Sequence, residues 1–91
     1  MEYDWDAGKR TANRAKHGVD FAVVEQFDWE NAIVADDQRR DYGEQRRIAI
    51  GRIGLRLYVL VFTQRGDVIR VIGLRKANPR ESKRYDEAQK T

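Results

Sequence analysis

The chain has no cysteine, only one proline and only one histidine among its 91 residues. The lack of cysteine excludes a disulfide scaffold, a zinc ribbon and a thiol nucleophile. No apolar run approaches the roughly 20 residues that a helix needs to span a bilayer. The acidic start, Met1–Asp6, lacks the basic and apolar regions of a signal peptide. We therefore expect a cytoplasmic protein that does not contact a membrane.

A chain of this length predicts a single domain that covers residues 1–91. Its net charge of +3 conceals a strong asymmetry between the two halves. Residues 1–38 hold four Lys or Arg against nine Asp or Glu, whereas residues 39–91 hold fourteen against six. Thirteen of the eighteen basic residues are arginine, whose planar guanidinium suits phosphate. The basic half indicates a polyanionic partner, and a solvated arginine-rich surface is the alternative.

Two short helices are predicted near the N-terminus. The first covers Ala7–Lys16, with Asp6 as its N-cap and Gly18 just beyond its end. Asp20 then caps a second short helix, which has one apolar face. Together these two elements predict a helical hairpin with a tight joint.

Four strands and a last helix are predicted in the rest of the chain. The strands are joined by hairpin-length connections and cover Ala32–Ala35, Glu44–Ile53, Leu55–Thr63 and Val68–Arg75. The sequence Asn78-Pro79-Arg80-Glu81 has the pattern of a capping box, which starts a helix over Pro79–Ala88. The predicted fold is of the α+β class: an N-terminal helical hairpin, a bent antiparallel sheet of about four strands, and a C-terminal helix.

His17 is the one side chain of this chain whose ordinary pKa lies near neutrality. Beside Lys16 at a helix end, it is either a favourable cation on the helix dipole or a general acid/base with a phosphate-binding neighbour. Metal catalysis fits poorly, because the chain has no second histidine and no cysteine. We therefore expect no metal and no cofactor.

Two arginines stand where a strand built only for burial would not place a cation. Arg65 ends a strand at a hairpin turn, and Arg75 interrupts an apolar strand just before the last helix. Both are therefore candidates to contact a ligand. Tyr85, in the last helix, is either a core residue or part of a site.

Several motifs along the chain carry a resemblance to a known family. They are Tyr3-Asp4-Trp5-Asp6, Lys16-His17-Gly18-Val19, Thr63-Gln64-Arg65 and Arg75-Lys76-Ala77, followed by Glu81 and Tyr85. In these motifs the chain resembles the BrnT family of bacterial type II toxins, from Tyr3 to Tyr85. Gly8, inside the first helix, departs from the pattern.

The resemblance implies a metal-independent endoribonuclease with a RelE-like fold, which inhibits translation by cutting RNA. It also implies a cognate antitoxin with a ribbon-helix-helix domain, a heterotetramer of the two proteins, and operator DNA bound only by that complex. The remaining alternative is a non-catalytic module that binds nucleic acid or a protein partner.

RNA cleavage without a metal proceeds by attack of the ribose 2′-OH on the adjacent phosphate. This attack requires a base, cations on the phosphoryl oxygens and a proton for the leaving oxygen. We expect His17 to be the base or the acid, and Lys16, Arg65 and Arg75 to hold the phosphate. The second proton-transfer group is expected to be Glu44 or Tyr85. Further candidates to bind the substrate are Arg46, Arg70 and Lys76.

Overall fold

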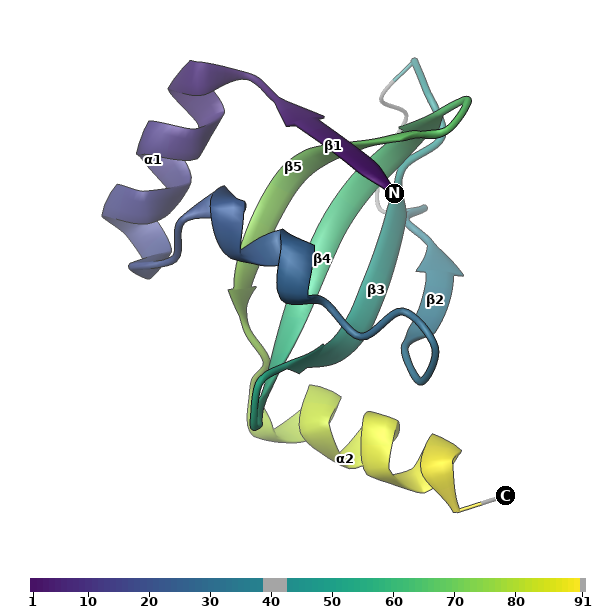
Figure 1. Cartoon of the computed structure of the whole chain (residues 1–91). Helices are drawn as coiled ribbons and strands as arrows, with labels where there is room; N and C mark the ends of the chain where they lie inside the picture. Colours follow the sequence, from purple (N-terminus) through teal and green to yellow (C-terminus); the bar gives the residue numbers. More distant parts are fainter. Residues whose placement is uncertain (39–42, 91) are drawn as a thin grey trace.

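The computed structural model describes residues 1–38 and 43–90 (Figure 1). Its elements occur in the order β1 (Glu2–Trp5), α1 (Ala7–His17), the 3-10 helix η1 (Phe21–Gln26), β2 (Ile33–Asp36), β3 (Arg47–Ile53), β4 (Arg56–Arg65), β5 (Val68–Lys76) and α2 (Pro79–Gln89). The five strands form one sheet in the order β1-β5-β4-β3-β2. Strands β2 to β5 are antiparallel neighbours, whereas β1 runs parallel to β5. Among the described residues, no helix is long and apolar enough to cross a bilayer.

The architecture expected from the sequence, a helical hairpin followed by about four antiparallel strands, was wrong. The chain begins with a strand, β1, whose Tyr3 and Trp5 are half-buried while Glu2 and Asp4 are exposed. Such a short, acidic segment has little local strand signal, and its partner β5 lies more than 60 residues away in the chain. The sheet is therefore mixed and has five strands.

The second predicted helix is the other correction. Asp20 does cap it, by accepting a hydrogen bond from the Ala22 N–H at 3.1 Å. The segment that follows is six residues of 3-10 helix rather than an α-helix, so no α-helical hairpin forms. Short polar-capped segments of this kind commonly adopt the tighter 3-10 geometry.

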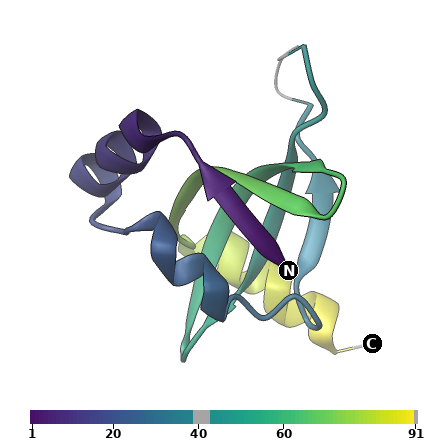
Figure 2. The same cartoon turned by 45° about the horizontal axis from the view of Figure 1, so that its top comes forward.

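The helical elements η1 and α2 lie on opposite faces of the sheet (Figure 2), and each face carries an apolar cluster. On one face, η1 and the residues around it bury the larger cluster, which includes Phe21, Val24, Phe27, Leu60, Phe62, Val71 and Leu74. On the other face, α2 contributes Tyr85 to a smaller cluster with Ile50 and Val59. The smaller cluster leaves part of that second face uncovered by a helix.

The edge of β5 is shared by β1 and α1. Strand β1 pairs with residues 68–71 of β5, so it leaves the second half of this edge without a strand neighbour. The buried side chain of Asn13 in α1 takes that place. Its Nδ2 donates to the Leu74 carbonyl at 2.7 Å, and its Oδ1 accepts from the Leu74 N–H at 3.2 Å. This amide therefore fixes α1 to β5, side by side in Figure 1.

A bulge interrupts the pairing of β5 with β4. Val61 pairs with Gly73 but Phe62 pairs with Val71, so Ile72 is one residue extra on β5. Bulges of this kind bend a strand locally and often lie beside functional sites. This one lies next to the contact between Asn13 and Leu74.

Candidate active site

A cleft lies on the sheet face opposite η1, between the end of α1 and the start of α2. We call its deeper part the inner hollow, which has a volume of about 440 Å³. The floor of the inner hollow is the sheet, and its lining residues there are Ile48, Ile50, Val59, Val61 and Gly73. Its walls carry Asn13, Lys16 and His17 from α1, Arg75 from β5, and Glu81 and Arg84 from α2. The walls are polar and largely cationic, whereas the floor is aliphatic.

A second hollow continues the cleft along α1. We call this part the outer hollow, which has a volume of about 450 Å³. It shares Asn13, Lys16, His17 and Gly73 with the inner hollow and adds Lys9, Ala12, Arg46 and Ile72. His17 and Lys16 therefore lie where the two hollows meet.

The local sequence fixes the position of His17. Helix α1 ends directly after it, because Gly18 adopts a left-handed conformation with φ 70° and donates to the Arg14 carbonyl at 2.9 Å. Two hydrogen bonds from Arg10 to the Asp20 carboxylate, at 2.7 and 2.9 Å, tie α1 to the chain that follows. These bonds lower the pKa of Asp20 to about 2, with Arg10 as the main cause. The end of α1 is thus held on both sides of the histidine.

The environment of His17 favours its neutral form. Partial burial lowers its pKa below the ordinary 6.5, and the positive charges of Lys16 and Arg75 lower it further. A histidine with a pKa below 6.5 is mostly neutral at pH 7, so it can accept a proton there. The arrangement combines one neutral base with neighbouring cations.

Arg75 is held by Glu81 from the first turn of α2. Its Nη1 and Nη2 each donate to one carboxylate oxygen at 2.8 Å. The Glu81 side chain is only 17% exposed, and it also accepts from the Asn78 N–H at 2.9 Å in the capping box. Arg75 is the main cause that lowers the pKa of Glu81. One carboxylate therefore both starts α2 and orients the guanidinium beside the cleft.

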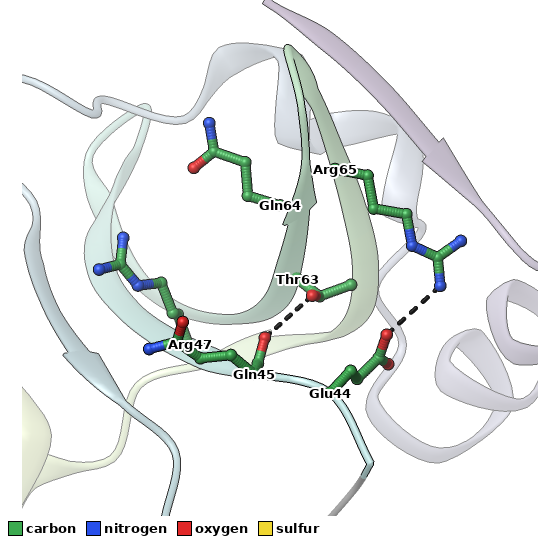
Figure 3. A pocket seen from close by; sticks show the side chains of 6 residues that line it. All are labelled: Glu44, Gln45, Arg47, Thr63, Gln64 and Arg65. Atoms are coloured by element: carbon green, nitrogen blue, oxygen red, sulfur yellow. Dashed lines mark hydrogen bonds and ion pairs between the residues drawn. The ribbon is translucent and has the colours of Figure 1, made fainter.

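Arg65 and Glu44 lie in another hollow, of about 550 Å³, at the far end of β3 and β4 (Figure 3). Arg65 donates from Nη2 to Glu44 Oε2 at 3.3 Å, and the nearby Thr63 hydroxyl donates to the Gln45 carbonyl at 2.9 Å. Glu44 also lies 3.9 Å from Nε of Arg46, which lines the outer hollow. These two predicted catalytic residues are thus connected to the cleft through Arg46 but do not line it.

Three other predicted residues also lie outside the cleft lining. Tyr85 is 3% exposed, and Cζ of Arg52 lies 5.6 Å from the centre of its ring. Arg70 forms an ion pair with Asp4 of β1 at 3.3 Å. Lys76 is exposed at the end of β5. The cleft thus brings together His17, Lys16, Arg75 and Arg46 from the predicted set.

Sequence reasoning did not assign roles to Asn13, Glu81 or Arg84. The sequence did offer an indication for Asn13, because asparagine is unfavourable in a helix interior. In the structure its amide forms hydrogen bonds with the edge of β5. Glu81 was recognised as a helix cap and as one of the residues that carry the family resemblance, but not as the partner of Arg75. Arg84 follows Glu81 by three residues and so shares its helix face, which is the pattern that would have indicated it.

The described residues contain no group of three or more His, Asp or Glu side chains placed to hold a metal ion. The donors around the cleft are mostly cationic, as expected for a site that binds an anion. His17 lies beside Lys16 and beside Arg75, whose guanidinium is held by Glu81. These features define the class: a small domain with a mixed sheet and a largely cationic cleft that suits an anionic ligand.

The sequence comparison agrees with this class. Residues 5–81 match the family described as ribonuclease toxin, BrnT, of type II toxin–antitoxin systems, and the chain belongs to this family. The resemblance noted from the motifs is thereby confirmed. No match was found among curated protein sequences. Membership makes the chain a ribonuclease toxin, with RNA as its substrate and an antitoxin as its partner.

Proposed function

We propose that the chain is a metal-independent endoribonuclease that arrests translation in the cytoplasm by cutting RNA in the cleft. The observation that carries this proposal is the position of the single histidine. His17 lies between two hollows, its pKa is lowered by burial, and Lys16 and Arg75 are near enough to lower it further. A neutral base with adjacent cations is what attack by a ribose 2′-OH requires.

The proposed reaction needs only side chains of the cleft. His17 takes the proton of the 2′-OH while the 2′-oxygen forms a bond to phosphorus. The bond from phosphorus to the 5′-oxygen breaks, and Lys16 gives that oxygen a proton. The products are a 2′,3′-cyclic phosphate and a 5′-hydroxyl, and proton exchange with water restores both side chains.

Arg75 stabilises the charge that develops on the phosphoryl oxygens during this attack. Because Glu81 fixes its guanidinium, little reorganisation is needed at the moment of reaction. Arg84, from the next turn of α2, adds a further positive charge on the same wall. Removing one such donor typically lowers kcat by about 10²- to 10³-fold.

The test is incubation of the purified chain with RNA in excess EDTA, with His17→Ala as control. We expect wild-type cleavage that survives chelation and leaves 2′,3′-cyclic phosphate ends, and no cleavage by the variant. Intact RNA with a salt-dependent gel shift would support the alternative of a non-catalytic binding module. Cleavage that EDTA abolishes would contradict metal independence.

We also propose how the antitoxin reaches the cleft. Strand β2 is an edge strand, and a groove along it is lined by Val34, Ile48, Ile50 and Arg84 among others. The last three residues also line the inner hollow. A segment of the antitoxin that pairs with β2 would therefore lie directly beside the catalytic groups, with its carboxylates toward Arg84.

The family supports a finer proposal for the complex. The antitoxin carries a ribbon-helix-helix domain, dimerises through it and carries two copies of the toxin as a heterotetramer. Operator DNA then binds to the complex and not to the toxin alone. Light scattering on the co-purified pair measures the stoichiometry, and a gel shift with operator DNA compares complex and toxin. A co-expressed neighbour that neither binds the chain nor inhibits it would contradict this proposal.

A further inference from the structure

Gly73 lies where the two hollows of the cleft meet. It lines both of them, and it pairs with Val61 directly beside the bulge of β5. His17 and Lys16, from the end of α1, also line both hollows. A ligand that extends from one hollow into the other therefore occupies the part of the cleft that these three residues line.

The fold itself does not require glycine at this position. Its backbone is not in the left-handed region, unlike that of four other glycines in the described residues. A Cβ atom built on Gly73 would lie 3.8 Å from Cβ of Val61 and 4.0 Å from Oδ1 of Asn13, which are ordinary contact distances. Gly51 differs, because a Cβ there would lie 2.6 Å from the Phe27 ring. Glycine weakens a strand, and within one it often marks a bulge or a place where a ligand or another backbone approaches closely. Gly73 lies beside a bulge and also lines the cleft, where a ligand can approach it.

We propose that a single RNA strand crosses Gly73, with the scissile phosphate between His17 and Arg75 and one flanking nucleotide in each hollow. This inference rests on the proposed ribonuclease function and specifies the path of its substrate. The missing side chain at residue 73 provides the space through which the sugar–phosphate backbone passes.

The two hollows offer different chemistry to the two nucleotides. The inner hollow has the aliphatic floor of Ile48, Ile50, Val59 and Val61, with the planar guanidinium of Arg84 on its wall. This combination accepts the apolar face of a nucleobase. The outer hollow is more basic, with Lys9 and Arg46, and accepts the ribose and the next phosphate. Base preference is therefore set in the inner hollow.

This path also predicts that the substrate is single-stranded. A base can enter the inner hollow only if it is not stacked and paired in a duplex. An A-form helix would present its phosphates to the cationic rim but would keep its bases away from the aliphatic floor.

The first test enlarges residue 73 in steps, with Gly73→Ala, Gly73→Val and Gly73→Leu. A Cβ atom at residue 73 meets its neighbours at ordinary contact distances, so we expect Gly73→Ala to melt at about the wild-type temperature, and thermal unfolding shows whether the valine and leucine variants are folded. The rate constant kcat/KM for a short single-stranded RNA should fall with side-chain size, by about 100-fold or more for valine and leucine. Binding of a non-cleavable analogue, 2′-deoxy at the scissile position, should weaken in the same order.

The matched control is Val68→Ile, which adds bulk to the same strand outside the cleft. It should retain wild-type kcat/KM. If Gly73→Val and Gly73→Leu fold and cleave at the wild-type rate, the proposed path is overturned. That outcome leaves the ribonuclease proposal intact, because the latter fails only if the wild type does not cleave RNA.

A second test uses the wild-type chain, so it does not depend on the folding of any variant. A target sequence that is cut as a single strand is annealed to its complement and assayed again. We expect cleavage to fall at least about tenfold in the duplex. Equal rates for the single strand and the duplex would overturn the proposed path.

Discussion

Two arginine–glutamate pairs lie at opposite ends of the sheet and differ in how tightly they are held. The Arg75–Glu81 pair has two hydrogen bonds of 2.8 Å, and its carboxylate is also part of a helix cap. The Arg65–Glu44 pair has one contact of 3.3 Å, and the Arg65 side chain is 60% exposed. The first guanidinium is fixed beside the histidine, whereas the second has room to move in solvent.

The difference in how tightly the two guanidinium groups are held indicates which of them can stabilise a transition state and which can only attract RNA. A transition state is stabilised by charge that is already in place, since reorganisation of a mobile side chain costs free energy. A mobile, solvent-exposed cation still attracts a polyanion, but its contribution is screened by salt. We therefore propose that catalysis takes place at the Arg75 end of the sheet and that the Arg65 end attracts RNA.

The largest effect is expected from His17→Ala. Loss of the proposed base should lower the cleavage rate by about 10²- to 10⁴-fold. The melting temperature should change little, because a partly exposed residue at a helix end contributes little to stability. Single-turnover cleavage and thermal unfolding of both proteins check this. A variant that cleaves at the wild-type rate would remove His17 from the mechanism.

Arg75→Gln should have the next largest effect. We expect kcat to fall by about 100-fold and RNA affinity to fall much less, because the fixed guanidinium acts mainly on transition-state charge. Kinetics on a cleavable RNA are compared with binding of its 2′-deoxy analogue. Equal losses in both measurements would indicate that Arg75 only binds RNA.

Glu81→Gln isolates the orienting role of the carboxylate. Glutamine keeps an oxygen that can accept from the Asn78 N–H. It lacks the second carboxylate oxygen and the negative charge, so it cannot accept both hydrogen bonds from the Arg75 guanidinium. We expect kcat to fall by about tenfold with unchanged KM and a nearly unchanged melting temperature. A fall in melting temperature that accounts for the whole loss of activity would make Glu81 structural only.

Local signals predicted the elements around the cleft well. The cap at Asp6 and the glycine at residue 18 placed the first helix within one residue, and the capping box did the same for the last helix. The turn at Arg65-Gly66-Asp67 placed the start of the last strand, predicted as Val68–Arg75 and observed as Val68–Lys76. Each of these signals lies within a few residues of the element that it determines.

Contacts between distant segments were not predictable in this way. The parallel pairing of β1 with β5 and the hydrogen bonds of Asn13 with Leu74 join residues about 60 positions apart. The bulge at Ile72, which sets the position of Gly73, depends on the match between two strands rather than on either alone. For the same reason, the sequence grouped Arg65 with Arg75, although only Arg75 lines the cleft.

The pH dependence of cleavage tests the electrostatics at the Arg75 end. If neutral His17 is the base, kcat/KM rises with pH through the histidine pKa, which lies below 6.5, and is constant near neutrality. Lys16 lowers this pKa, so Lys16→Met should move the acidic limb to higher pH as well as lower the rate. Pre-steady-state cleavage rates measured from about pH 4.5 to about pH 8 give the position of this acidic limb. A limb that does not move would show that Lys16 does not act on the histidine.

The smallest effect is expected at the other pair, from Arg65→Gln. An exposed cation outside the cleft contributes to the attraction of RNA, so its removal should weaken affinity a few-fold and leave kcat nearly unchanged. The slope of log Kd against log salt should decrease by about 0.7, the value for one phosphate contact on a single strand. Arg56→Gln is the control for loss of a charge, since Arg56 lines neither the cleft nor the Glu44 hollow. A loss of kcat as large as that of Arg75→Gln would show that the Arg65 end takes part in catalysis, and the distinction between the two ends would fail.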